Sequence, residues 1–148
     1  MAYFTYDTSV IISRSLTELL AMPGGFLMSA IVLTELSASA RDNSELKLYE
    51  RVFRAYQQER RLIVPNDEDW LLTSRILFLL TNHRRRLEHG KLQRMPRGAS
   101  QNLALDVLIS VSARRWKAQV VTENWRDFKV IQRYCNTRII KAASFFGY

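Results

Sequence analysis

The chain has 148 residues, of which 47% are hydrophobic and 24% charged, and it carries 22 Lys and Arg against 14 Asp and Glu. This length can bury a sizeable core, so we expect one domain over residues 1–148. No apolar run is long enough to span a membrane, and the single cysteine, Cys135, excludes an internal disulfide and a thiolate zinc cage, as expected for a cytoplasmic protein. The net charge of +8 favours a polyanionic partner, with a basic solvated surface as the alternative.

Short β-favouring segments alternate with helical patterns along the chain. Strands are expected at 2–6, 26–28, 62–64, 119–122 and 138–140. Helices are expected at 8–21, 29–38, 44–58, 70–80, around 103–111 and at 125–135, whereas the basic, glycine- and proline-interrupted residues 82–99 predict irregular structure. This alternation predicts an α/β fold, in which crossover helices cover both faces of a parallel sheet.

Acidic and amide side chains occur near the ends of the predicted strands. Asp7 follows the first strand, Glu35 lies about two turns into the helix after the second, and Thr122, Asn124 and Asp127 follow a later strand. Open parallel sheets bind ligands beyond the carboxyl ends of their strands. We therefore expect these separate side chains to converge in space.

Asp106 is the most informative single residue. It lies between Leu105 and Val107 in a helix that is apolar on almost every side, where an unpaired ionised carboxylate is costly. Asn102, one helical turn earlier, shares its face and could support it. The pattern predicts a cation beside Asp106.

Each of these residues also has an ordinary structural interpretation. Asp7 suits a helix cap, Glu35 could be an exposed helix glutamate, and Asp106 could pair with an arginine. Asn124 and Asp127 could each cap the helix that follows them. Taken together, however, several hard oxygen ligands without a histidine–cysteine set predict Mg²⁺ or Mn²⁺. An acid cluster that holds such an ion next to a bound polyanion predicts phosphodiester hydrolysis.

Four segments carry a resemblance to a known family. The chain resembles the PIN-domain nucleases, and most closely the VapC-type toxins of prokaryotic toxin–antitoxin pairs, through YDTSVII, SAIVLTEL, LDVLISVSA and VTENWRDF. The segments occur in family order, and the resemblance covers essentially the whole chain. It implies a three-layer α/β/α sandwich with a central parallel sheet of four to five short strands. Two departures are visible: SVSA stands where the family usually has alanine-rich residues, and the basic segment after the helix at 70–80 is unusually dense in arginine.

The resemblance also implies roles for individual residues. The catalytic and metal-binding acids would be Asp7, Glu35, Asp106 and Asp127, supported by Thr122 and by Asn124 as a further metal ligand. Because the family's last motif varies in which position bears the acid, the choice between Asn124 and Asp127 stays open.

A dense basic segment precedes the helix of Asp106. It includes Arg84, Arg85, Arg86, Arg94 and Arg97. These arginines are expected to bind RNA by guiding its phosphates, with a solvated loop and helix end as the structural alternative.

The expected function follows from the resemblance. It implies a divalent-metal-dependent endoribonuclease that leaves 5′-phosphate and 3′-hydroxyl ends and acts as the toxin of a toxin–antitoxin module. It further implies a homodimer inhibited by a small antitoxin, for which the amphipathic helix at 44–58 is a candidate groove wall. Two alternatives remain, a catalytically inactive PIN-like module that binds nucleic acid and a protein-interaction module.

Overall fold

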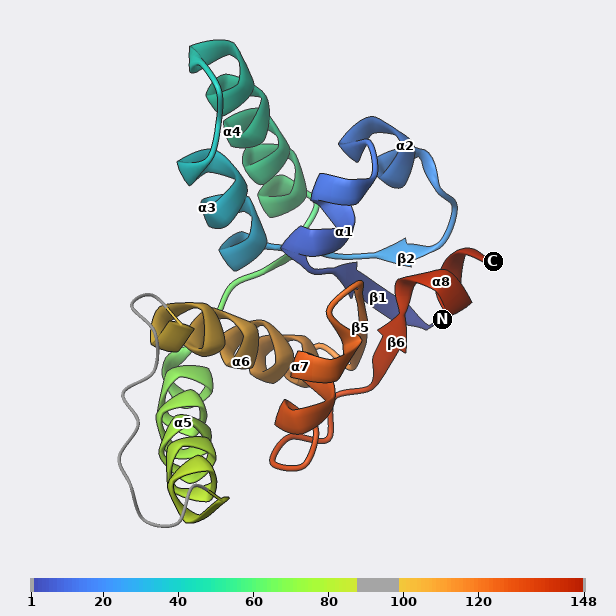
Figure 1. The fold of residues 1–148 in the computed structure, drawn as a ribbon. Coiled ribbons are helices and arrows are strands. Elements are labelled where there is room, and N and C mark those ends of the chain that lie inside the picture. The colour runs from blue at the N-terminus through green and yellow to red at the C-terminus, as the bar shows by residue number, and fades with distance from the viewer. Residues whose placement is uncertain (1, 88–98, 148) are drawn as a thin grey trace.

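Short strands alternate with helices along the chain in a computed structural model, which describes residues 2–87 and 99–147 (Figure 1). The strands are β1 (Tyr3–Tyr6), β2 (Gly25–Phe26), β3 (Met28–Ser29), β4 (Leu62–Ile63), β5 (Ala118–Thr122) and β6 (Ile139–Lys141). The helices are α1 (Thr8–Ser13), α2 (Leu16–Ala21), α3 (Ala30–Ala38), α4 (Asn43–Gln58), α5 (Asp67–Leu87), α6 (Ala99–Arg115), α7 (Trp125–Ile131) and α8 (Ala142–Phe146). Within the described ranges, no helix combines the length and apolarity that crossing a bilayer requires.

The strands pair in parallel throughout. β2, β1, β5 and β6 form one sheet in that order, and β3 pairs with β4. Only Leu27 separates β2 from β3, and its backbone N–H donates to the carbonyl of Phe4 at 2.9 Å. The two sheets are therefore continuous, and all their strands end at one edge. This arrangement confirms the predicted α/β fold with a central parallel sheet of short strands.

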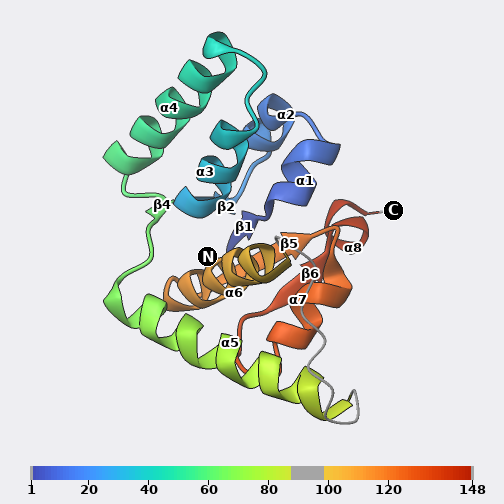
Figure 2. The same ribbon diagram turned by 60° about the vertical axis from the view of Figure 1, so that its left-hand side comes forward.

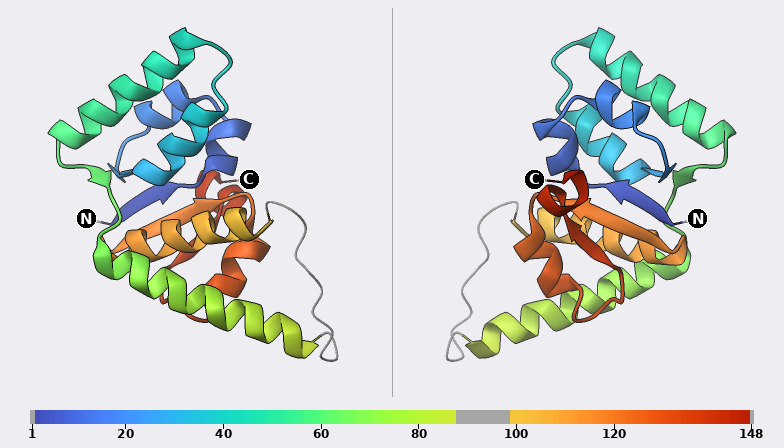
Figure 3. Two further views of the ribbon diagram at one scale, coloured as in Figure 1. Left: turned by 90° about the vertical axis from the view of Figure 1, so that its left-hand side faces the viewer. Right: turned by 90° about the vertical axis from the view of Figure 1, so that its right-hand side faces the viewer.

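Helices cover both faces of this sheet. Along β1, Phe4 and Tyr6 point to the same face, where their rings lie 4.9 Å and 6.1 Å from the ring of Phe145 in α8. Helix α6 crosses the opposite face (Figure 3). As the sequence predicts, α6 is apolar and buried, and its buried hydrophobic residues are Val107, Leu108, Ile109, Val111 and Ala113.

Several element boundaries differ from the sequence-based expectation; for example, the strand expected at 26–28 is divided into β2 and β3, and α6 spans Ala99–Arg115 instead of residues around 103–111. The helix expected over 8–21 is divided into α1 and α2, because Arg14 is extended and its guanidinium lies 3.7 Å from the ring centre of Phe146, a tertiary contact. Helix α5 continues through residues 81–87, so the irregular structure expected from residue 82 is wrong there, because this part of the segment has neither Gly nor Pro and arginine favours helices. Helix α7 ends at Ile131, and the short helix α8 was not predicted.

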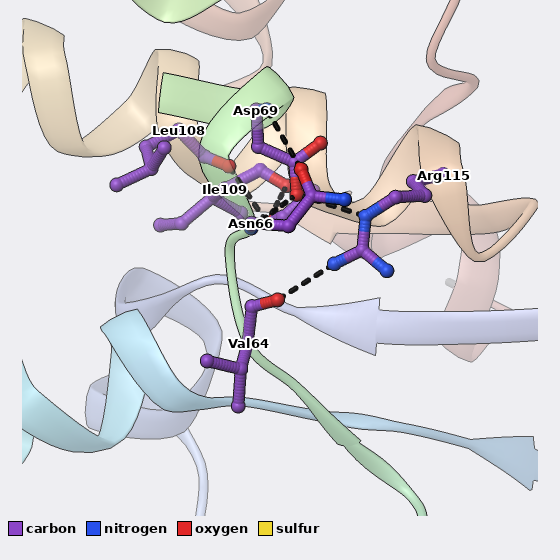
Figure 4. Close-up of polar contacts among 7 residues, drawn as sticks. Val64, Asn66, Asp69, Leu108, Ile109 and Arg115 are labelled. Carbon is purple, nitrogen blue, oxygen red and sulfur yellow. Dashed lines mark hydrogen bonds and ion pairs between the residues drawn. The ribbon is translucent and has the colours of Figure 1, made fainter. Parts of the chain in front are cut away.

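A polar cluster fixes the start of α5 against α6 (Figure 4). Asn66 and Asp69 form a reciprocal cap, in which the Asn66 N–H donates to Asp69 Oδ2 at 3.0 Å and the Asp69 N–H donates to Asn66 Oδ1 at 2.9 Å. Arg115 of α6 donates to Asp69 Oδ2 at 2.9 Å and to the carbonyl of Val64 at 2.6 Å. The cluster thereby anchors the carboxyl end of the helix that carries Asp106, and Figure 2 shows the start of α5 beside this end of α6.

Candidate active site

Asp7 is held at the exit of β1 by three hydrogen bonds. Its side chain is buried, with 3% exposure. Asp7 Oδ2 accepts from the hydroxyl of Thr122 at 2.7 Å, and Oδ1 accepts from the hydroxyl of Ser9 at 2.6 Å and from the N–H of Val10 at 3.3 Å. The pKa of Asp7 is raised above its ordinary value, because burial raises it by more than these hydrogen bonds lower it. Asp7 is thus the cap of α1 and also a carboxylate at the edge of the sheet.

Glu35 of α3 lies at the same corner. It is half-buried, and its Oε1 accepts from the hydroxyl of Thr8, the residue next to Asp7, at 3.0 Å. Burial raises the pKa of Glu35, the Thr8 hydrogen bond lowers it, and the negative charge of Asp7 raises it. The structure therefore brings Glu35 and Asp7 together, although 28 positions separate them in the chain.

Asp106 lies on α6 facing the other acids. Burial, the largest cause, and the negative charges of Asp7, Glu35 and Asp127 together raise its pKa to about 7. Among the described residues, Asp106 has no hydrogen bond and no ion pair, so the expected alternative of an arginine partner is absent there. Four acids from separate elements thus influence one another at the carboxyl edge of the sheet, and Asp106 is the least compensated.

The segment after β5 supplies the fourth side of the site. The buried hydroxyl of Thr122 accepts from the N–H of Asn124 at 2.8 Å while it donates to Asp7. Asn124 precedes α7 without a side-chain cap bond, and Asn124 and Asp127 both line an open cavity of about 560 Å³. Either can present oxygen to the site. Asn102 is exposed on α6, one turn before Asp106.

Three further residues position these acids. Besides bonding Asp7, the Ser9 hydroxyl accepts from the N–H of Glu123 at 3.2 Å. Glu123 accepts from the hydroxyl of Ser13 at 3.3 Å, and its charge raises the pKa of Asp7. Thr8 holds Glu35. The sequence indicates Thr8 and Ser9 only as capping residues, because a cap and a positioning hydroxyl carry the same local signal.

The donor set suits a hard divalent cation. In the described part of the chain, however, no group of three acidic, histidine or cysteine side chains is arranged so that it could hold a metal ion. The oxygens of Asp7 and Glu35 are engaged by hydroxyls instead. Carboxylates that repel one another, with Asp106 uncompensated, nevertheless match the ligand chemistry of Mg²⁺ or Mn²⁺. Binding would require side-chain rotation toward a common point.

The arginines expected to bind RNA are not located by the structure. Arg84, Arg85 and Arg86 belong to the last turns of α5, but their side chains lie outside the described residues, as Arg94 and Arg97 do entirely. Their contact with phosphate stays a prediction.

Comparisons with known proteins bear on the fold. No protein-family model and no curated protein sequence matches the chain. Among solved structures, it is similar to VapBC-1 from nontypeable Haemophilus influenzae, at 16% identity and a TM-score of 0.60 over 97% of this chain and 99% of that one. It is also similar to DNA-bound VapBC from Salmonella typhimurium, at 17% identity and a TM-score of 0.56 over 96% of this chain and 99% of that one.

A third similar structure is FitAcB from Neisseria gonorrhoeae, at 18% identity and a TM-score of 0.54 over 93% of this chain and 96% of that one. Identities this low concern the fold alone, and the matches run nearly end to end. Together with the parallel sheet and the order of its strands, they confirm the resemblance that the four sequence segments predict. The chain has the PIN-like α/β fold that VapC-type proteins share.

Proposed function

We propose that this protein is a divalent-metal-dependent endoribonuclease and the toxin of a toxin–antitoxin pair. The observation that supports this most directly is the convergence of Asp7, Glu35, Asp106 and Asp127 at the carboxyl edge of the sheet, with Asp106 uncompensated. A purely structural cluster would neutralise such an acid with a cation or hydrogen bonds. The PIN-like fold agrees with this function but does not establish it.

The residues divide into ligands and positioning groups. Asp7, Glu35, Asp106 and either Asp127 or Asn124 would hold Mg²⁺ or Mn²⁺, which supplies an activated water and charge stabilisation at the leaving oxygen. Thr122 and Ser9 orient the carboxylate of Asp7, and Thr8 orients that of Glu35. Four mutually repelling acids would also repel the scissile phosphate, so that phosphate is accommodated among them only when a cation is bound.

The proposal is tested by incubating the purified protein with single-stranded and structured RNAs. We expect cleavage in Mg²⁺ or Mn²⁺, with 5′-phosphate ends on the products, and none after a chelator is added. A mock preparation from cells that lack the gene controls for contaminating nuclease. Cleavage by the protein that persists in chelator, but not in the mock sample, contradicts metal dependence.

Thr122→Val is expected to lower RNA cleavage about tenfold without unfolding the protein. The substitution conserves shape but removes the hydroxyl that binds Asp7 and the N–H of Asn124. Thr73→Val is a matched control, because Thr73 is also buried and its hydroxyl has no hydrogen-bond partner among the described residues. Initial cleavage rates and thermal melts of both variants measure the effect. Equal rates in the two variants would show that Thr122 does not position the site.

The surface also offers places for the proposed partners. A groove of about 440 Å³ between α3 and α4 is lined by Leu33, Thr34, Ser37, Tyr49, Glu50, Phe53, Arg54 and Gln57. This supports the amphipathic helix α4 as a wall for a small antitoxin. On α5, Trp70, Leu71 and Phe78 are exposed apolar side chains, which suit a contact between two copies of the chain.

A further inference from the structure

A cavity that carries cationic and aromatic side chains, together with the carboxylates of Glu123 and Asp127, adjoins the acid cluster. Trp125, Arg126 and Lys141 line the same cavity of about 560 Å³ as Thr122 and Asp127. Thr122 is hydrogen-bonded to Asp7, and the charge of Asp127 acts on Asp106. The cavity is therefore a direct extension of the candidate active site.

Lys141 is positioned by both the sheet and an aromatic ring. As the last residue of β6 it pairs in register with Thr122 of β5, which places it at the carboxyl edge. Its Nζ lies 4.3 Å from the ring centre of Trp125. An indole face attracts an ammonium group without neutralising its charge. In the described part of the chain, Lys141 has no ion pair with a carboxylate, so its charge remains free to act on a ligand.

The cations of the cavity, next to the acid cluster, point to an anionic ligand. The acid cluster repels the phosphates that flank a scissile bond, so a bound polynucleotide needs cations beside that cluster. Arg126 and Lys141 are the cationic side chains that line the adjoining cavity. A single-stranded chain can follow such a groove more readily than a rigid duplex.

We propose that Lys141, held against Trp125, and Arg126 bind a non-scissile phosphate of single-stranded RNA and seat the strand beside the acids. This inference rests on the proposed nuclease function and adds to it a phosphate subsite formed by residues other than the basic segment at 83–97. Lys141 and Arg126 are then positioning residues, because they contact the substrate away from the reacting phosphate.

The test is binding of a fluorescently labelled single-stranded RNA to the full chain in chelator, measured by anisotropy at several salt concentrations. Lys141→Gln should weaken binding about fivefold at 0.1 M salt and make the slope of log K against log salt shallower by about 0.7, the value for one phosphate contact on a single strand. Lys141→Arg should restore both values, since it retains the charge.

Lys129→Gln is the matched control. Lys129 contacts the same indole ring, at 5.3 Å from its centre, but is not among the side chains that line the cavity. It should bind within about twofold of the unmodified protein, because Lys129 lies outside the cavity and would not contact the phosphate bound there. Thermal melts of each variant establish that it is folded before binding is compared.

The outcomes separate this subsite from the nuclease proposal. Loss of affinity in Lys141→Gln alone supports the subsite. Equal losses in Lys141→Gln and Lys129→Gln, or no loss in either, overturn the subsite while cleavage by the unmodified protein still supports the nuclease. Lys141-dependent binding without cleavage in any divalent metal overturns the nuclease and leaves the phosphate site standing. Absence of RNA binding by the unmodified protein at low salt overturns both.

Discussion

Replacing Asp106 with Asn is expected to reduce RNA cleavage at least about 100-fold, because even residues that only support a metal ligand contribute 10- to 100-fold. Asp106 is the acid whose charge is least compensated, so it has the most to gain from a bound cation. Asn keeps the shape and removes the charge. Binding of RNA in chelator should stay within about twofold, since phosphate contacts come from basic residues. Single-turnover cleavage and anisotropy measure the two effects separately.

Asp67→Asn is the matched control for this prediction. Asp67 is exposed in the first turn of α5, outside the cluster, and the same substitution there should leave cleavage unchanged. Full cleavage by Asp106→Asn would contradict the assigned role. Binding without cleavage by the unmodified protein would favour an inactive nucleic-acid-binding module, and failure to bind RNA at low salt would favour a protein-interaction module.

In chelator, the free energy of unfolding is expected to fall as the pH rises from 5 to 8. The pKa of Asp106 is about 7 in the folded protein, against an ordinary pKa of 3.8 for an exposed aspartate, as in the unfolded chain. Between these values the folded state binds the proton more tightly, so the stabilisation is complete below the unfolded pKa and is lost as the pH rises through 7. The raised pKa values of Asp7 and Glu35 act in the same direction.

The effect of Asp106 on stability should be about 2 kcal/mol, roughly half of what the full pKa difference implies, because solvent screens a half-buried carboxylate. Asp106→Asn should therefore melt about 4–8 °C higher than the unmodified protein at pH 8 in chelator. At pH 5 the two melting temperatures should approach each other, since Asp106 is then largely protonated. Thermal melts across this pH range, followed by circular dichroism, measure the difference.

Added divalent metal should reverse the loss at pH 8. At 100 times its Kd, Mg²⁺ or Mn²⁺ should stabilise the unmodified protein by about 2.7 kcal/mol and Asp106→Asn by much less. The same pH dependence in both proteins would show that Asp106 does not carry the destabilising charge. An equal gain from metal in both would place the cation elsewhere.

Local patterns predicted most of the elements that carry the site. The β-favouring residues before Asp7 and the apolar helix around Asp106 were identified correctly because alternation and burial are properties of short segments. The helix expected at 29–38 was also identified correctly, since its capping bond, from the N–H of Val32 to the hydroxyl of Ser29, spans only three residues. The division of α1 from α2 was missed, because Arg14 contacts Phe146 from the far end of the chain.

The sequence by itself determined that an acid would be buried at Asp106 and that strands would leave several acids at one edge. It also indicated the resemblance to the PIN-like fold, because the four matching segments occur in the family's order even though sequence identity to the similar structures is low. Only the tertiary structure decided that the hydroxyl of Thr8 donates to Glu35, that the hydroxyl of Thr122 donates to Asp7 and that Lys141 lines the same cavity as Asp127. These contacts join residues distant in the chain, and strand order and register, rather than local propensity, set which of them meet.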